Sequence, residues 1–223
     1  MKKLIIAAIS ATLFASVASA DITNIGIKLS SGNLAATGTE TTNSSTTVTQ
    51  TERDADFEMG SVFVERQIET SDKFNLTIGL DYVPMTAEVA SLGGSTGFDA
   101  TVSAGNLFTA YLQPTFIVND NVSVFGKVGY ASGDLEITNI SRQATAAATG
   151  DSASTDGPQD KTLEGTMYGI GAQINPASGP IGFIRLEYTQ TDFDKISHTN
   201  SNSKKLTADA ELELITLSIG KSF

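Results

Sequence analysis

ELELITLSIGKSF, residues 211–223, closes the chain with two kinds of side chain in alternation. From residue 215 to the end, one phase is mostly branched and apolar, with Lys221 as the exception, and the other is small and polar. Because successive side chains of a strand point to opposite faces, this pattern predicts a β-strand whose two faces meet unlike surroundings. Residues 215–223 are long enough to cross a bilayer as a tilted strand. The apolar phase comprises Ile215, Leu217, Ile219 and the terminal Phe223.

The chain begins with MKKLIIAAISATLFASVASA, which has the features of a secretory signal peptide. Two lysines provide a basic start, residues 4–17 form an apolar core, and the small residues 18–20 form a cleavage signal. A transmembrane helix is disfavoured because the core is short and is interrupted by Ser10 and Thr12. We therefore expect residues 1–20 to be removed and residues 21–223 to fold as one domain.

The composition excludes several classes of function. The chain has no Cys and no Trp, so zinc or iron sites built on thiolates are impossible and no disulfide holds the fold. It carries 14 Lys and Arg against 25 Asp and Glu, and this acidic balance argues against nucleic acid as a partner. No cofactor is expected. After residue 20 no apolar run is long enough for a membrane helix, so a membrane-spanning chain would have to cross with strands.

Period-two alternation predicts eight strands along the chain. The connections between them alternate between long and short, and small or polar residues dominate the long ones, which we expect to be exposed loops. A soluble sandwich gives no reason for this regular segregation, whereas a transmembrane barrel has short turns on one side and long loops on the other. The predicted strands are residues 22–30, 57–68, 74–83, 107–118, 122–130, 167–174, 183–188 and 211–223. The predicted long loops are residues 36–52, 84–105, 138–161 and 192–205.

Large aromatic residues recur in the apolar phase near the ends of the predicted strands. In a membrane barrel such positions form two girdles, where amphipathic rings meet the lipid headgroups. A general preference of strands for aromatic residues explains their presence but not their common phase and height. The outer girdle is expected to comprise Tyr82, Phe108, Tyr130, Tyr168 and Tyr188, and the inner girdle Phe74, Phe116 and Phe223.

Residues 112–130, 167–172 and 184–188, with the terminal Phe223, resemble the small eight-stranded outer-membrane barrels, the opacity-protein-like and OmpA-like transmembrane domains. The resemblance covers residues 21–223 and implies an all-β, eight-stranded antiparallel up-and-down transmembrane β-barrel in the bacterial outer membrane. It also implies contact with outer-membrane lipid and lipopolysaccharide and insertion by the outer-membrane assembly machinery; we expect a monomer. Lys221 departs from the aromatic or apolar residue that is usual in the closing strand. The expected assembly signal comprises Ile215, Leu217, Ile219 and Phe223.

The inward phase contains charged residues of both signs. An eight-stranded barrel is just wide enough for side chains to fill its interior, and buried charges need partners because their desolvation is costly. One interpretation is a network of salt bridges that fills the lumen, with Arg185 near Glu187 or Asp81, and another is a gated ion path lined by the same residues. The sequence favours the first but does not say which pairs form. The predicted inward charges are Lys28, Glu65, Asp81, Lys127, Arg185 and Glu187.

The sequence offers little support for catalysis or metal binding. The single histidine, His198, lies beside Ser197, but hydroxyl-rich segments place such neighbours by composition alone. Asp151, Asp156 and Asp160 miss the spacing of a calcium loop. We therefore expect no enzyme but a structural barrel that presents its surface for adhesion, surface interaction or envelope integrity. The alternatives are a small ion-conducting channel, a soluble lipocalin-like carrier, which would need an apolar lumen, and a lipid A-modifying enzyme.

Overall fold

The computed structural model describes residues 22–42, 45–84, 86–92, 98–142, 154–155, 159–199 and 205–223, which form one antiparallel sheet. Within these ranges no helix is long and apolar enough to cross a membrane. The strands are β1 (Ile22–Thr42), β2 (Ser45–Ser71), β3 (Phe74–Val83), β4 (Ala87–Leu92), β5 (Phe98–Asn119), β6 (Val122–Arg142), β7 (Ser154–Thr155), β8 (Gln159–Ile174), β9 (Phe183–Phe193), β10 (Ile196–Thr199) and β11 (Lys205–Ser222).

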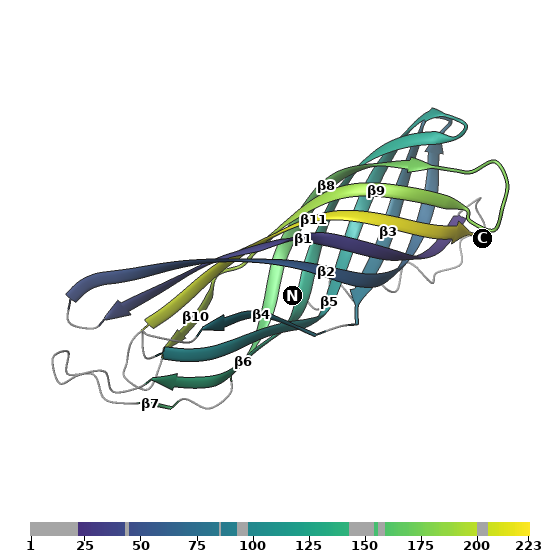
Figure 1. Ribbon diagram of the computed structural model, residues 1–223. Coiled ribbons are helices and arrows are strands. Elements are labelled where there is room, and N and C mark those ends of the chain that lie inside the picture. Colours follow the sequence, from purple (N-terminus) through teal and green to yellow (C-terminus); the bar gives the residue numbers. More distant parts are fainter. Residues whose placement is uncertain are drawn as a thin grey trace.

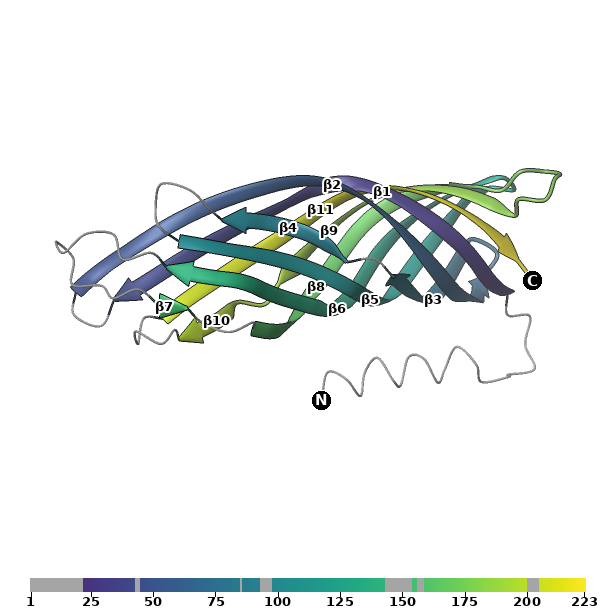
Figure 2. The same ribbon diagram turned by 60° about the horizontal axis from the view of Figure 1, so that its bottom comes forward.

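The long strands close into a ring, as Figure 1 and Figure 2 show. Strand β1 pairs with β2 on one side and with β11 on the other, which joins the start of the ring to its end. Two backbone hydrogen bonds between Thr23 and Phe223, 3.1 and 2.9 Å long, continue this seam to the last residue. The ring contains β1, β2, β3, β5, β6, β8, β9 and β11, so the predicted eight-stranded antiparallel up-and-down barrel is confirmed.

The prediction of long irregular loops was wrong for most of the described residues in those segments. Strands β1 and β2 stay paired beyond residue 36 until Thr42 meets Ser45, so this segment is a β-hairpin. In the other three segments, β4, β7 and β10 pair as continuations of β3, β8 and β9. Thr-rich segments fit a pleated sheet once neighbouring strands supply backbone partners, which composition alone does not reveal. Residues 43–44, 85, 93–97, 143–153, 156–158 and 200–204 lie outside the described part of the chain.

Short connections join the strands at the opposite end of the barrel, beside Phe223 (Figure 1). In the turn between β5 and β6, the Asn119 side chain accepts hydrogen bonds from the amides of Asn121 and Val122, both at 3.0 Å, as asparagine often does in tight turns. The short connections are residues 72–73, 120–121 and 175–182. We call this the turn end and the opposite end the hairpin end.

The long strands consist of two sections that differ in which face is apolar. On β11, Ile215 and Leu217 are exposed and Thr216 between them is buried, whereas nearer the hairpin end Glu213 is exposed and Leu214 is buried. The inward and outward phases are unchanged, but their polarity is exchanged. We call the part with apolar outward side chains the belt section and the part with polar outward side chains the hairpin section. The exposed side chains change in the same way on β2 (Val62 and Glu58), β6 (Val128 and Asp134), β8 (Ile170 and Thr162) and β9 (Leu186 and Asp192).

The predicted phases are confirmed in the belt section. On β2, Glu65 is buried, as predicted for an inward charge; Phe63 in the same phase is also buried, and Val62 in the other phase is exposed. Ala110 differs from its exposed neighbours in the outward phase, since it is buried between Leu80 and Tyr130 of the adjacent strands. A methyl group is too short to reach past such neighbours. The belt section therefore has an apolar exterior and a polar interior, and the hairpin section has the reverse.

Candidate functional site

Charged side chains of both signs converge in the interior of the belt section. The Lys28 ammonium on β1 lies 2.5 Å from a carboxylate oxygen of Asp81 on β3 and 3.1 Å from one of Glu187 on β9. The Lys127 ammonium on β6 contacts the other carboxylate oxygen of Glu187. Glu187 thus bridges two lysines, and we call Lys28, Asp81, Lys127 and Glu187 the ionic layer.

Arg185 and Glu65 form a second buried ion pair, nearer the turn end. Two guanidinium nitrogens donate to the two carboxylate oxygens at 2.6 and 3.1 Å, the bidentate geometry in which arginine binds a carboxylate strongly. The Tyr111 hydroxyl donates to the same carboxylate at 2.5 Å. The side-chain oxygen of Gln173 accepts two more hydrogen bonds from Arg185, at 3.1 and 2.8 Å.

The structure places all six of the predicted inward charges in the lumen and joins them in these two groups. The sequence left the partner of Arg185 open, with Glu187 or Asp81 as expected neighbours, and the structure shows that its ion pair is with Glu65. Strands β2 and β9 are not adjacent, so this pair forms across the lumen, and its geometry depends on the stagger of the strands. Sequence reasoning did not single out Tyr111 or Gln173, although their inward phase was readable.

The burial of these charges makes their pairing obligatory. Glu65 is 0% exposed and Arg185 is 1% exposed, and an unpaired ion at such a depth would cost several kcal/mol. Aromatic rings add to the pairing, since the Arg185 guanidinium lies 4.8 Å from the Phe183 ring centroid and the Lys127 ammonium 4.5 Å from that of Tyr111. The network therefore fills and cross-links the lumen of the belt section.

Aromatic side chains fill much of the remaining lumen, and each of four rings lies over a glycine of the neighbouring strand. Tyr111 on β5 is directly opposite Gly79 on β3, where a Cβ atom would overlap the ring. The missing side chain lets the ring lie against the neighbouring backbone. The four pairs are Phe63 with Gly26, Tyr111 with Gly79, Phe125 with Gly171, and Phe183 with Gly220.

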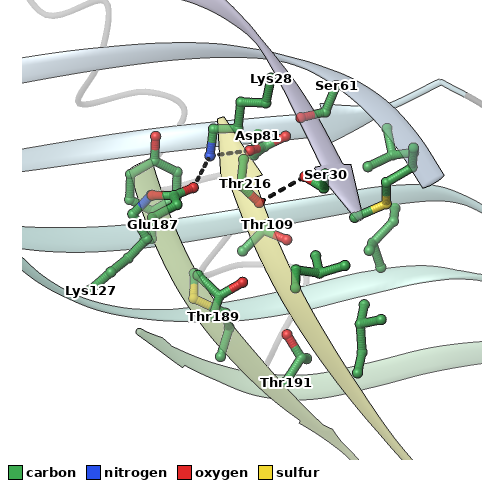
Figure 3. Close-up of a pocket in the computed structure, with 17 residues that line it drawn as sticks. Lys28, Ser30, Ser61, Asp81, Thr109, Lys127, Glu187, Thr189, Thr191 and Thr216 are labelled. Atoms are coloured by element: carbon green, nitrogen blue, oxygen red, sulfur yellow. Dashed lines mark hydrogen bonds and ion pairs between the residues drawn. The ribbon is translucent and has the colours of Figure 1, made fainter. Parts of the chain in front are cut away.

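A cavity of about 50 Å³ lies on the hairpin side of the ionic layer (Figure 3). The ionic layer and Tyr111 form its wall toward the turn end, and serine and threonine side chains line its flanks. Two of these, Ser30 and Thr216, share a hydrogen bond of 2.7 Å across the seam between β1 and β11. The wall toward the hairpin end is apolar and comprises Met59, Leu107, Leu212 and Leu214.

Beyond this cavity, apolar side chains fill the lumen of the hairpin section. The buried members, which we call the apolar plug, are Ala131, Leu135, Leu163, Phe193, Leu212 and Leu214. Partly buried residues, among them Leu34 and Phe57, pack against the plug. Sequence reasoning missed this cluster because it ended most strands near the aromatic girdle, and in the strands that it carried further it assumed one apolar face throughout. The signal was present in Glu211-Leu212-Glu213-Leu214, where the alternation continues with its polarity exchanged.

The predicted girdle residues lie in the outward phase near the two ends of the belt section. At the hairpin side the rings of Tyr82 and Phe108 stack with centroids 4.3 Å apart, and at the turn side those of Phe74 and Phe116 lie 5.2 Å apart. The hydroxyls of Tyr168 and Tyr188 donate to carboxylates at the start of the hairpin section. The expected assembly-signal residues Ile215, Leu217, Ile219 and Phe223 are all exposed on the outward face.

Residues considered for catalysis or metal binding do not form a site in the described part of the chain. His198 is on β10 opposite Leu206, and its neighbour Ser197 points to the other face of that strand. Asp160 is exposed on β8, whereas Asp151 and Asp156 lie outside the described residues. Among the described residues, no group of three or more His, Asp or Glu could hold a metal ion.

Comparison with known proteins extends these observations. A model of the family described as "Outer membrane protein beta-barrel domain" matches residues 5–219. The outer membrane protease OmpT of Escherichia coli aligns over 93% of this chain and 99% of its own, with a TM-score of 0.50 and 8% identity, which shows a shared fold. The attachment invasion locus protein Ail of Yersinia pestis aligns over 86% of this chain and 97% of its own, at 13% identity and a TM-score of 0.38. Neisserial surface protein A aligns over 87% and 97%, at 10% identity and a TM-score of 0.36. No curated protein sequence matches significantly.

Proposed function

The chain belongs to the outer membrane protein β-barrel family, and from this premise we propose that it is a non-conducting barrel that presents its hairpin section for interactions at the bacterial surface. Lipid would surround the belt section, whose outward side chains are apolar. Short turns of such barrels face the periplasm, so the hairpin section would project outward. On this proposal, residues 1–20 direct export, the last strand is read by the assembly machinery, and the barrel acts as a monomer.

The filled lumen is the observation that carries the non-conducting assignment. The ionic layer and the Arg185–Glu65 pair occupy the belt section, and the apolar plug occupies the hairpin section. The cavity between them has a volume of about 50 Å³, which is far too small for a continuous column of water through the barrel. Ions cross a pore only where water or polar groups surround them, and an apolar constriction provides neither.

The outward face of the hairpin section indicates the chemistry of a partner. Carboxylates are exposed on this face on the two strands that flank β1, at Asp54, Asp56 and Glu58 on β2 and at Asp209 and Glu213 on β11. Lys195, exposed beside them, is paired with Asp209 at 3.0 Å. Such a surface attracts positively charged partners and repels anionic ones. We therefore propose that the hairpin section binds basic surfaces through β2 and β11.

Two measurements test this function on the purified, detergent-folded protein. In planar bilayers, the protein should insert without steady ion conductance. On polylysine-coated beads it should be retained at low salt and released as salt rises, because exposed charges more than about 10 Å apart are screened at 0.1 M ionic strength. Steady conductance of the wild-type protein would reject the non-conducting assignment.

A pair of matched variants separates a binding surface from net charge. Asp54→Asn, Asp56→Asn and Glu58→Gln together remove three charges from the hairpin section, and retention on polylysine should fall. Asp72→Asn, Asp120→Asn and Glu69→Gln remove the same charge at the turn end, where all three residues are exposed. This control should be retained nearly as well as the wild type. Equal losses in the two variants would show that only total charge matters.

A further inference from the structure

The sheet that closes the belt section opens between β2 and β4 in the hairpin section. Strand β2 pairs with β3 from Val62 toward the turn end. Strand β4, which continues β3, pairs with β5 and, among the described residues, not with β2. Figure 1 shows β2 and β4 running apart toward the hairpin end. Within the part of the chain that the structure describes, residues 54–60 of β2 therefore have a paired neighbour, β1, on one side only, and we call their other side the free edge.

The backbone groups at the free edge follow from the pairing at the seam. Thr23 and Phe223 exchange both of their backbone hydrogen bonds, so the amide and carbonyl of Thr23 point toward β11. Such groups alternate in direction along a strand, and the register of β1 with β2 and β11 is unbroken from residue 24 to residue 41. Even-numbered residues of β1 thus bond to odd-numbered residues of β2, as in the pair of Ser30 and Met59. The amides and carbonyls that point out of the free edge belong to Asp54, Asp56, Glu58 and Gly60.

The two faces of β2 differ in chemistry along the free edge. Asp54, Asp56 and Glu58 are exposed on the outward face. Phe57 and Met59 point inward, where they are only partly buried against the apolar plug. A strand added at the free edge would place alternate side chains beside the carboxylates on the outside and beside Phe57 and Met59 on the inside. The added strand would gain most if basic and apolar residues alternate along it.

A second copy of this chain does not fit the free edge. Two β2 strands paired antiparallel about Asp56 would put Asp54 opposite Glu58 and each Asp56 opposite its own copy. Like charges directly opposite one another destabilise a strand pair. Charged side chains on edge strands are a general means by which proteins avoid pairing between copies. The same carboxylates favour a strand of opposite charge.

We propose that the free edge of β2 binds an extended basic segment of another protein as an added antiparallel strand. The backbone of the segment hydrogen-bonds to the groups that point out of the free edge, as in other cases of strand addition. Its basic residues pair with Asp54, Asp56 and Glu58, and its apolar residues cover Phe57 and Met59. This inference rests on the proposed binding of basic surfaces and adds what such a partner contains: a segment that can extend, with a basic residue at every second position.

Two labelled peptides of the same composition test the proposal on the wild-type protein folded in detergent. One alternates lysine and valine over seven residues, beginning and ending with lysine, and the other has its four lysines followed by its three valines. Fluorescence anisotropy, with empty micelles as the blank, should show at least about tenfold tighter binding of the alternating peptide, because its side chains match both faces of β2. Equal affinities would overturn strand addition, whereas failure of the wild type to bind polylysine would overturn the proposed function itself.

A matched pair of variants tests the backbone contribution. Glu58→Pro and Glu58→Ala both remove the carboxylate, but only proline also removes the amide hydrogen at the free edge. Proline is tolerated on an edge strand where this hydrogen lies outside the ladder, and the heat-dependent gel shift confirms a closed barrel. Glu58→Pro should bind the alternating peptide at least about fivefold more weakly than Glu58→Ala, while both are retained equally on polylysine. Equal affinities for the peptide would overturn strand addition. If Glu58→Pro shows no gel shift, the two peptides on the wild type decide alone.

Analytical ultracentrifugation of the detergent-folded protein without peptide tests the competing occupant. The wild type should sediment as a monomer, because the carboxylates of two free edges repel each other. A dimer that Glu58→Pro dissociates and Glu58→Ala preserves would assign the free edge to a second copy of the chain and overturn the proposed partner.

Discussion

Replacing Glu65 by glutamine removes a single charge from the centre of the lumen while almost preserving the shape of the side chain. The wild-type carboxylate accepts two hydrogen bonds from Arg185 and one from Tyr111, and none of these three side chains is more than 1% exposed. A glutamine offers one acceptor oxygen where the guanidinium and the hydroxyl need two. Glu65→Gln therefore leaves the Arg185 cation in the barrel interior without its counter-charge.

The expected loss is large because the pair is fully desolvated. Removing one partner of a buried ion pair costs about 3–5 kcal/mol of unfolding free energy, most of it from the charge left behind. Replacing both partners with apolar residues, Glu65→Leu with Arg185→Met, leaves no unpaired charge. This double variant should recover most of the loss, apart from about 1–3 kcal/mol for polar groups of Gln173 and Tyr111 that lose a partner.

Reversible urea unfolding in lipid vesicles measures these differences, with circular dichroism and the heat-dependent gel shift as probes because the chain has no Trp. Glu69→Gln makes the same chemical change at an exposed position of β2 and should shift stability by no more than about 0.5 kcal/mol. The reasoning is refuted if Glu65→Gln matches that control. It is equally refuted if the double variant loses as much as the sum of its single variants, since coupled partners must deviate from additivity.

Three further changes test other parts of the barrel. Gly171→Ala should lower the unfolding free energy in urea by about 1–3 kcal/mol, because a Cβ atom would overlap the Phe125 ring. Gly126→Ala on the open outward face should lower it by less than about 0.5 kcal/mol. Equal losses in the two variants would contradict the packing of the ring over the glycine. Leu214→Ala should lower the unfolding free energy by about 2–5 kcal/mol, because it leaves a cavity in the apolar plug. The control Asp209→Ala, at an exposed position of the same strand, should lower it by no more than about 1 kcal/mol. An unchanged unfolding free energy in Leu214→Ala would show that the plug does not stabilise the fold. Deletion of Phe223 should lower the amount of heat-modifiable barrel in outer membranes, while Lys221→Ala should assemble normally; unchanged assembly without Phe223 would count against the last strand as a signal.

The belt section was predictable because lipid outside and a polar lumen inside impose one simple pattern on each strand. Apolar and small polar side chains alternate over residues 215–219. This alternation alone predicts the position and length of the strand and which of its faces meets lipid. The six inward charges were identifiable for the same reason, since phase alone places a side chain in the lumen. Pairing was not, because whether Arg185 reaches Glu65 or Asp81 depends on the stagger between strands on opposite sides of the barrel.

The hairpin section was missed although its alternation is just as regular. Residues 54–59 read DADFEM, in which Phe57 and Met59 are turned toward the interior and Asp54, Asp56 and Glu58 are exposed. The apolar residues here occupy the phase that carries polar residues a few positions further on, so a search for one continuous apolar face stops at the exchange. The polar composition of these segments is typical of loops, so it did not predict that their backbone stays paired in the sheet.

The exchange of polarity also explains why the register of β11 is well specified. On β9 and β11 it falls at paired positions, since Glu213 is opposite Gln190 and Ile215 is opposite Tyr188. A slip that turned β11 by one residue would send Glu213 into the plug and Leu214 into water, and at the same time Ile215 into the polar lumen. Each section alone would oppose that slip. Because the two sections have opposite patterns, moving the strand relative to the membrane surface could not remove the penalties of both sections together. A barrel that crosses a bilayer and then continues as a water-soluble sheet is therefore held in register twice along the same strand.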